Sequence, residues 1–286
     1  EHAYRPNPPQ PTVPVSVSPS GRLFPVTLQT RGTMNVITEN LDGKAALITG
    51  ASSGIGESTA EALAEAGASV ALAARREDEL EQLADRIESE GGEALVVPTD
   101  VTDEAEIQEM VDRTHEEFGS LDILVNNAGV MLLERVEDAD TDNFQQMVEV
   151  NLLGLMNVTH TALPIMQQQG EGHVVNISSV AGRKAYAGSS GYNATKFGVN
   201  GFSEALREEV TGDDDIRVTL IEPGFVDTEL AEHIPDDEQQ EQAKEALEAM
   251  DALTPDDIAR SIAYAVGQPS HVDVNEILIR PTDQEL

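Results

Sequence analysis

The chain of 286 residues contains no cysteine and no tryptophan, and only four of its residues are lysine. Without cysteine it forms neither disulfides nor thiolate nucleophiles, and it offers no cysteine ligands for zinc. Its six histidines show no metal-binding spacing such as HExxH, so we expect no metal site. No apolar run approaches the roughly 18 residues needed to cross a bilayer, and the segment from Val13 to Val17 is too short and proline-broken for a secretory signal. We therefore expect a water-soluble, cytoplasmic protein.

Basic residues are scarce relative to acidic ones: 17 Lys and Arg against 53 Asp and Glu give a formal net charge of −36. Such a surface repels nucleic acid and anionic membranes, so we expect neither as a partner. The acids are spread through periodic segments rather than gathered in an acidic disordered tail. Because salt screens their repulsion within about 3 Å at 1 M, this composition favours a salt-rich cytoplasm, as in halophilic archaea.

Residues 1–33 differ in composition from the rest of the chain. They hold seven of the fourteen prolines, and three Arg against a single Glu, which is typical of a linker or disordered segment. Met34 is the first methionine and precedes the first globular segment. We expect the native protein to start at Met34 and the preceding extension to have no role in catalysis; the alternative is a genuine flexible arm.

From Leu41 onward, short apolar runs alternate with amphipathic stretches, the pattern of repeated βα units. Residues 34–286 are therefore predicted to form one α/β domain, a doubly wound Rossmann sheet of seven mostly parallel strands with helices on both faces. The longest helices are expected over Thr141–Gln168 and Gly191–Val210. The acidic segment Asp227–Ala249 follows a strand, which predicts a lid; the alternative is a solvated helix. The predicted strands are Ala45–Thr49, Ser69–Ala73, Ala94–Pro98, Ile123–Asn126, His173–Ile177, Arg217–Glu222 and Glu276–Ile279.

A glycine-rich turn with the spacing Gly-x3-Gly-x-Gly follows the first predicted strand. Glycines at a strand–helix junction let the backbone approach a pyrophosphate, and the helix N-terminus offers unpaired N–H groups to it. A glycine cluster alone is often a plain tight turn, but the strand before it and the helix after it favour a dinucleotide site. The residues expected at this site are Gly50, Ser52, Ser53, Gly54, Ile55 and Gly56.

The end of the second strand indicates which dinucleotide binds. NAD enzymes usually carry an acid there, but this chain has Ala74 followed by Arg75 and Arg76. Arginine grips a 2′-phosphate bidentately, which favours NADP(H) over NAD(H); the alternative is that both arginines balance the acids after them. Asp100 and Val101, after the third strand, are expected to face the adenine. At the end of the fourth strand, Asn126 and Asn127 are expected to tie neighbouring strands together, while the small residues Ala128 and Gly129 leave space for the cofactor, with Asn127 also at the cofactor site; the alternative is a plain turn.

Tyr192 and Lys196 lie four residues apart, so on a helix their side chains share one face, one turn apart. There an ammonium group lowers the pKa of a phenol and makes it usable as an acid or base near neutral pH. Such a pair also arises by coincidence. Ser179, thirteen residues upstream, and Asn151 accompany it and raise its specificity.

With these motifs the sequence resembles the classical short-chain dehydrogenase/reductases, from about Leu41 to the C-terminus. Thr49–Gly56 is similar to the family's TGxxxGxG and Asn126–Gly129 to its NNAG. Tyr192–Lys196 is similar to its YxxxK, and Pro223–Thr228 to its PGxxxT. The resemblance implies an oxidoreductase that transfers hydride between a nicotinamide dinucleotide and a secondary alcohol or carbonyl compound.

The resemblance also implies a role for each catalytic residue. Tyr192 exchanges a proton with the substrate oxygen, and Lys196 lowers the pKa of the tyrosine and holds the nicotinamide ribose. Ser179 hydrogen-bonds the carbonyl and the developing alkoxide, and Asn151 positions a water that joins Lys196 to solvent. Ser178 competes with Ser179 for this role, but the offset to the tyrosine favours Ser179. The resemblance also implies that Val226 and Thr228 meet the nicotinamide carboxamide and a nearby phosphate, and that Pro223 and Gly224 contact the cofactor.

Ala181–Tyr186 and His271–Thr282 resemble a narrower branch, the NADP-dependent 3-hydroxy acid dehydrogenases that include serine dehydrogenases. Their substrates carry a carboxylate, with which Arg183 or Lys184 is able to pair; the alternative is that both lie on a solvated loop. Other hypotheses are a reductase of 3-oxoacyl thioesters or sugars, and a non-catalytic dinucleotide sensor, a class that usually lacks the tyrosine or the lysine. Specificity among the substrate classes is expected to lie in Met131–Val136 and in the acidic segment. The family implies a homodimer or homotetramer built on the two longest helices.

Overall fold

The computed structural model describes residues 41–212 and 215–284. The expected extension, residues 1–33, and the expected start at Met34 lie outside these ranges and stay predictions. None of the helices in the described ranges is both long and apolar enough to span a membrane.

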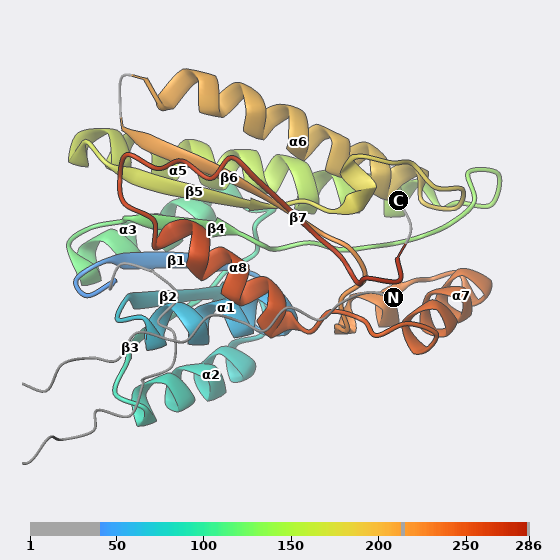
Figure 1. Ribbon diagram of the computed structural model, residues 1–286, viewed down its shortest axis with the longest axis horizontal. Helices are drawn as coiled ribbons and strands as arrows, with labels where there is room; N and C mark the ends of the chain where they lie inside the picture. The colour runs from blue at the N-terminus through green and yellow to red at the C-terminus, as the bar shows by residue number, and fades with distance from the viewer. Residues whose placement is uncertain (1–40, 213–214, 285–286) are drawn as a thin grey trace, which may run out of the picture. The chain divides into compact units, whose positions relative to one another are not determined.

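Seven strands form one sheet, as predicted (Figure 1). The order across the sheet is 3-2-1-4-5-6-7, so the chain reverses direction of winding between the first and fourth strands, the doubly wound arrangement. Every neighbouring pair is parallel, which confirms the expected parallel sheet, because a helical crossover precedes each later strand. The strands are β1 (Ala45–Thr49), β2 (Ser69–Ala74), β3 (Glu93–Pro98), β4 (Ile123–Asn126), β5 (Gly172–Ile177), β6 (Ile216–Pro223) and β7 (Glu276–Ile279).

Helices cover both faces of the sheet (Figure 1). Successive side chains of a strand point to opposite faces, so Ala46 and Ile48 of β1 enter one core while Leu47 enters the other. Both cores are sealed, and all five residues of β1 are buried, as expected for a strand covered on both sides. The first core is closed by α1 (Gly54–Glu65), α2 (Glu77–Ser89) and α8 (Pro255–Val266), and the second by α3 (Glu104–Phe118), α5 (Leu155–Gln169) and α6 (Ser190–Val210).

The helix predicted over Thr141–Gln168 is interrupted. α4 (Thr141–Val148) is followed by the π-helical segment η1 (Glu149–Gly154), and only then by α5. A Cβ on Gly154 would lie 2.8 Å from the Val101 carbonyl oxygen, so glycine allows this wide turn to approach the loop after β3. π-helical turns often occur at functional sites, and this one carries Asn151.

The acidic segment after β6 is helical, as expected, but in two pieces. A 3₁₀ helix, η3 (Glu229–His233), precedes α7 (Asp237–Glu248). Asp236 caps α7 by accepting a hydrogen bond from the Gln239 backbone N–H at 2.8 Å. A second 3₁₀ turn, η2 (Val180–Gly182), links β5 to the loop before α6.

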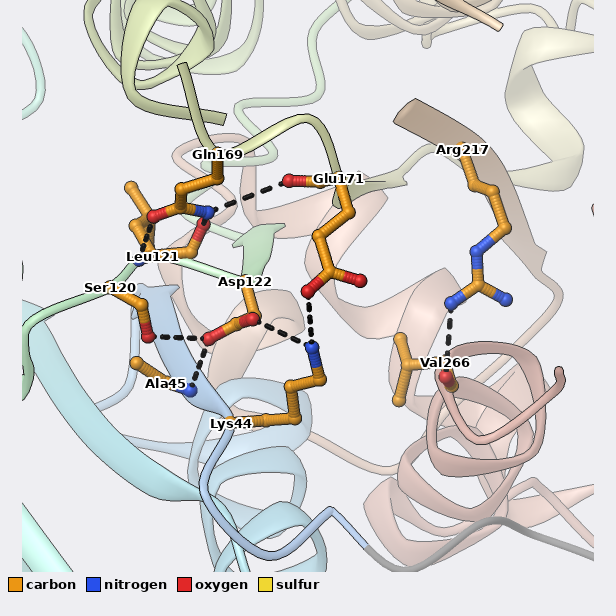
Figure 2. A network of polar contacts seen from close by, with 9 residues as sticks. All are labelled: Lys44, Ala45, Ser120, Leu121, Asp122, Gln169, Glu171, Arg217 and Val266. Atoms are coloured by element: carbon orange, nitrogen blue, oxygen red, sulfur yellow. Dashed lines mark hydrogen bonds and ion pairs between the residues drawn. The ribbon is translucent and has the colours of Figure 1, made fainter. Parts of the chain in front are cut away.

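A polar network lies where the strands begin (Figure 2). The Asp122 carboxylate accepts hydrogen bonds from Lys44 Nζ at 2.9 Å, the Ala45 backbone N–H at 2.9 Å and Ser120 Oγ at 2.6 Å. Lys44 also pairs with Glu171 at 3.0 Å, just before β5. Burial by itself raises the pKa of the Asp122 carboxyl, but the three hydrogen bonds outweigh it and lower the pKa. The network therefore joins the starts of β1, β4 and β5.

Candidate active site

The predicted site residues lie at the opposite edge, where the strands end. In a parallel sheet the carboxyl ends of all strands meet at one edge, and ligands bind where the winding reverses. Here the reversal falls between β1 and β4, which the glycine turn and the Asn127 loop follow.

The turn between β1 and α1 is shaped to let a ligand approach its backbone. Gly50 has φ +67° and Gly54 φ +57°, the left-handed region that favours glycine. A Cβ on Gly56 would lie 2.2 Å from the Gly50 carbonyl oxygen, so only glycine fits. Ser53 is the N-cap of α1 but makes no side-chain cap hydrogen bond, which leaves the first N–H groups of the helix to another partner. This geometry fits a diphosphate.

Asn127 fastens the turn to β4. Its Nδ2 donates to the backbone carbonyls of Thr49 at 3.0 Å and Gly50 at 3.1 Å. Thr49 Oγ1 in turn accepts from the backbone N–H groups of Asn127 at 3.0 Å and Ala128 at 3.1 Å. The tie between neighbouring strands was expected from the asparagines, whereas the role of Thr49 was not; its sequence signal is its place as the first residue of the segment that resembles TGxxxGxG.

Arg76 bridges the glycine turn and the acidic segment. Its guanidinium donates to Ser52 Oγ and to the Ser52 carbonyl, both at 3.2 Å, and pairs with Glu229 at 3.2 Å. Arg75 is exposed and shares a surface hollow with Asp100. Arg76 therefore contacts the turn but already binds a carboxylate, whereas Arg75 lies toward the loop after β3.

Asp100 and Val101 differ in exposure. Asp100 Oδ1 accepts from Thr102 N–H at 2.9 Å and Thr102 Oγ1 at 2.8 Å. Burial by itself raises the pKa of Asp100, but these hydrogen bonds and the charge of Arg75 lower it. Val101 is a core residue under η1. Asp100 thus keeps an accessible carboxylate, whereas Val101 offers mainly its backbone.

Ser179, Tyr192 and Lys196 come together, as predicted. Tyr192 is only 8% exposed and is hydrogen-bonded to the Ser179 side chain. Lys196 Nζ lies 5.6 Å from the centroid of the Tyr192 ring and donates to the Ile177 carbonyl at 2.9 Å. The competing Ser178 is engaged elsewhere, since its Oγ donates to Asn200 Oδ1 at 2.5 Å. The geometry favours Ser179 as the partner of the phenol.

The pKa of Tyr192 moves opposite to the expectation. Burial raises it to about 12, although the hydrogen bond with Ser179 partly offsets this. Burial also lowers the pKa of Lys196 to about 8. The expected lowering does not arise within the polypeptide, because the ammonium group bonds the Ile177 carbonyl rather than the phenol. Near neutral pH the phenol is therefore protonated and able to donate.

Asn151 binds the loop after β4 with both ends of its amide. Its Oδ1 accepts from the Val130 N–H at 2.7 Å, and its Nδ2 donates to the Val130 carbonyl at 2.8 Å and to Thr195 Oγ1 at 3.3 Å. The side chain thus joins η1 to this loop and to α6. Its part in a water relay stays a prediction.

Arg183 is not available for a substrate carboxylate. Its Nε donates to both Glu222 oxygens at 2.7 Å, and its Nη2 pairs with Glu276. Glu222 is fully buried, and Asn200 Nδ2 donates to it at 2.8 Å. The hydrogen bonds that Arg183 donates to Glu222 and Glu276 raise its pKa. The expected pairing with substrate is therefore wrong for Arg183, while Lys184 stays exposed with its Nζ 5.5 Å from the Tyr186 ring centroid.

The segment after β6 lies over the glycine turn. Val226 bridges to Leu253, and Thr228 Cγ2 lies 3.2 Å from where a Cβ of Gly54 would be. On the other side, a Cβ on Gly188 would lie 2.4 Å from Gln239 Oε1 of α7. The acidic segment therefore contacts both the cofactor turn and the loop before α6.

An apolar surface adjoins the phenol. Met147 and Ala181 form one cluster with Tyr192, and partly buried residues of the loop after β4 and of α4 pack on it. The expected specificity segment, Met131–Val136, begins within this cluster. The packed residues are Val130, Met131, Leu132, Leu133 and Phe144.

Comparison with known proteins agrees with this geometry. The family model described as short chain dehydrogenase matches residues 44–239. An uncharacterized oxidoreductase of Staphylococcus saprophyticus is 40% identical over 248 residues, which cover 86% of this chain and 99% of that protein. An alcohol dehydrogenase of the archaeon Thermococcus sibiricus, solved with 5-hydroxy-NADP, is 31% identical with a TM-score of 0.75, covering 85% of this chain and 98% of that one. A serine dehydrogenase in its closed form with NADP+ is 34% identical with a TM-score of 0.78, covering 85% and 96%.

Fold and site together thus define an oxidoreductase with a dinucleotide-binding Rossmann sheet. The chain belongs to the short-chain dehydrogenase family.

Proposed function

We propose that the protein is an NADP(H)-dependent oxidoreductase that interconverts a secondary alcohol and the matching carbonyl compound. The observation that carries the proposal is the meeting of Ser179, Tyr192 and Lys196 at the strand ends, on the same edge of the sheet as the glycine turn. When bound, the nicotinamide supplies or accepts the hydride.

The chain's own residues supply the proton and hold the substrate oxygen. In reduction, Tyr192 donates its phenolic proton to that oxygen, and in oxidation it takes the proton back. Ser179 donates a hydrogen bond to the oxygen as negative charge develops on it. The buried Lys196 ammonium, 5.6 Å from the ring, stabilises the phenolate left after donation. Exclusion of water by the apolar cluster strengthens these interactions.

The arginines after β2 support NADP(H) over NAD(H). Arg76 lies against Ser52 of the turn, and Arg75 follows β2 next to it, so a 2′-phosphate would meet donors from the turn and from the end of β2. Two of the similar structures were solved with NADP+ or 5-hydroxy-NADP.

The substrate class is a small alcohol or carbonyl compound. The serine dehydrogenase among the similar structures supports a 3-hydroxy acid. With Arg183 bound to Glu222, the cation of this loop that is left for a carboxylate is Lys184. A 3-oxoacyl thioester or sugar reductase of the same family is the alternative, followed by a dinucleotide sensor without turnover.

Exposed apolar residues on α5, α6 and η1 support assembly into a homodimer or homotetramer. Apolar residues left on the surface in one region commonly mark an interface. The net charge of −36 supports work in a salt-rich cytoplasm. The exposed apolar residues are Leu153, Met156 and Phe197.

Replacing Tyr192 with Phe tests the proposal. Without the hydroxyl no proton is exchanged, so turnover should fall at least about a hundredfold. Nicotinamide absorbance should be followed with a panel of alcohols and ketones in molar salt, with NADP and NAD in parallel. NADPH fluorescence serves as the control and should show unchanged binding. Full turnover by Tyr192→Phe would rule out the proposed acid, and a wild-type chain that binds but never turns over would favour the sensor.

A further inference from the structure

We propose that Gln284 is a positioning residue for the segment Pro223–Thr228, and that it acts on the nicotinamide half of the cofactor site. The proposal rests on the proposed function, because it assumes that a nicotinamide dinucleotide binds at the strand ends. No motif in the sequence marked Gln284.

Gln284 is buried at a place where a polar side chain needs a partner. It is 6% exposed, and its Oε1 accepts a hydrogen bond from the Phe225 backbone N–H at 3.0 Å. Its own backbone N–H donates to the Pro281 carbonyl at 3.1 Å, which closes a turn and aims the side chain at the segment after β6. The amide oxygen thus satisfies a backbone group of that segment.

Gly224 permits this close approach. Its N–H donates to the Ile279 carbonyl at 2.7 Å, which continues the pairing of β6 with β7. A Cβ on Gly224 would lie 2.1 Å from Gln284 Oε1 and 2.7 Å from Arg280 Cβ. A side chain at position 224 would push the turn that carries Gln284 away, so the hydrogen bond of Gln284 depends on the glycine.

Phe225 is consequently held from two sides. The Phe225 N–H donates to Gln284 Oε1, and the Phe225 carbonyl accepts from the Leu253 N–H at 3.1 Å. The next residues lead to Thr228, which lies against Gly54. Loss of the Gln284 acceptor removes one of the two anchors ahead of Val226 and Thr228. Among the described residues, Arg75, Arg76 and Gly50–Gly56 make no hydrogen bond with Gln284, and the turn meets the anchored segment at its far end, at Thr228. The adenine half should therefore lose less than the nicotinamide half.

The experiment compares two ligands on matched variants. Gln284→Met keeps the side-chain length but removes the acceptor, and Gln284→Glu keeps an acceptor at the same reach. NADPH binding is followed by its fluorescence and 2′,5′-ADP binding by calorimetry, in the same molar salt. We expect Gln284→Met to weaken NADPH binding roughly three- to tenfold and 2′,5′-ADP binding less than about twofold, with Gln284→Glu close to wild type.

Equal weakening of both ligands, or none of either, would overturn the positioning role. If Gln284→Met fails to fold by circular dichroism, Gln284→Asn repeats the test, because its amide is one methylene too short to reach Phe225. A wild-type chain that binds neither ligand would refute the proposed function, whereas binding of both by every variant would refute only the role of Gln284.

Discussion

Glu229 should weaken the binding of NADP(H) because it shares Arg76 with the cofactor. Its carboxylate lies 3.2 Å from Arg76 Nη2, where a 2′-phosphate oxygen would also bind. The side chains of the pair are 48% and 50% exposed, and ion pairs of such exposure are worth about 0.2–1 kcal/mol. Releasing the pair by Glu229→Gln should therefore tighten NADPH binding by up to about fivefold.

NADH is the internal reference, since it lacks the 2′-phosphate and should bind both proteins equally. Glu61→Gln is the matched control: it also removes one negative charge, but from a pair with Arg86 at 3.0 Å, on α1 and α2. Fluorescence titrations of both cofactors in one fixed salt concentration measure the ratio. Equal tightening of NADPH and NADH would show a general effect of charge, and weaker NADPH binding would show that Glu229 helps to build the site. Either result refutes the competition.

Two further predictions concern stability and assembly. Burial, with the nearby charge of Arg217, holds the pKa of His173 well below its ordinary value of 6.5. Below about pH 6.5 the unfolded chain therefore binds a proton that the folded chain excludes. The free energy of unfolding should fall there as the pH drops, by up to about 1.4 kcal/mol per pH unit. His173→Gln, whose amide can still reach Thr219, should flatten this slope in denaturant titrations followed by circular dichroism, and a slope equal to wild type would contradict the assignment. Phe197 on α6 is 47% exposed, and a charge there should disrupt the proposed interface between subunits, so Phe197→Asp should reduce the mass measured by light scattering. Val136→Asp, on a loop, is the control. An unchanged mass for Phe197→Asp would place the interface elsewhere.

The fold was predictable because its signals are local. Four of the five residues of β1 are apolar, and Gly50 follows the strand directly. The later strands are also short, mostly apolar runs, and predicted and observed bounds differ by at most one residue at an end. The π-helical η1 was not predictable. It depends on the approach of Gly154 to the Val101 carbonyl, and its own residues look like any amphipathic helix.

The site shows the same limit. Tyr192 and Lys196 are one helical turn apart, so their shared face follows from spacing alone. The partner of Arg183 is Glu222, 39 residues further along the chain, and no sequence pattern near Arg183 predicts this ion pair. Likewise the raised pKa of Tyr192 comes from burial by distant segments, which spacing within a helix does not reveal.

The network around Asp122 has a practical consequence. β1 is five residues long, so about 16 Å of buried strand separates Asp122 and Lys44 from the glycine turn. Effects of substitutions at that distance normally add. Substitutions in the network around Asp122 that change the stability of the protein should therefore leave the candidate active site, at the opposite edge of the sheet, unaffected.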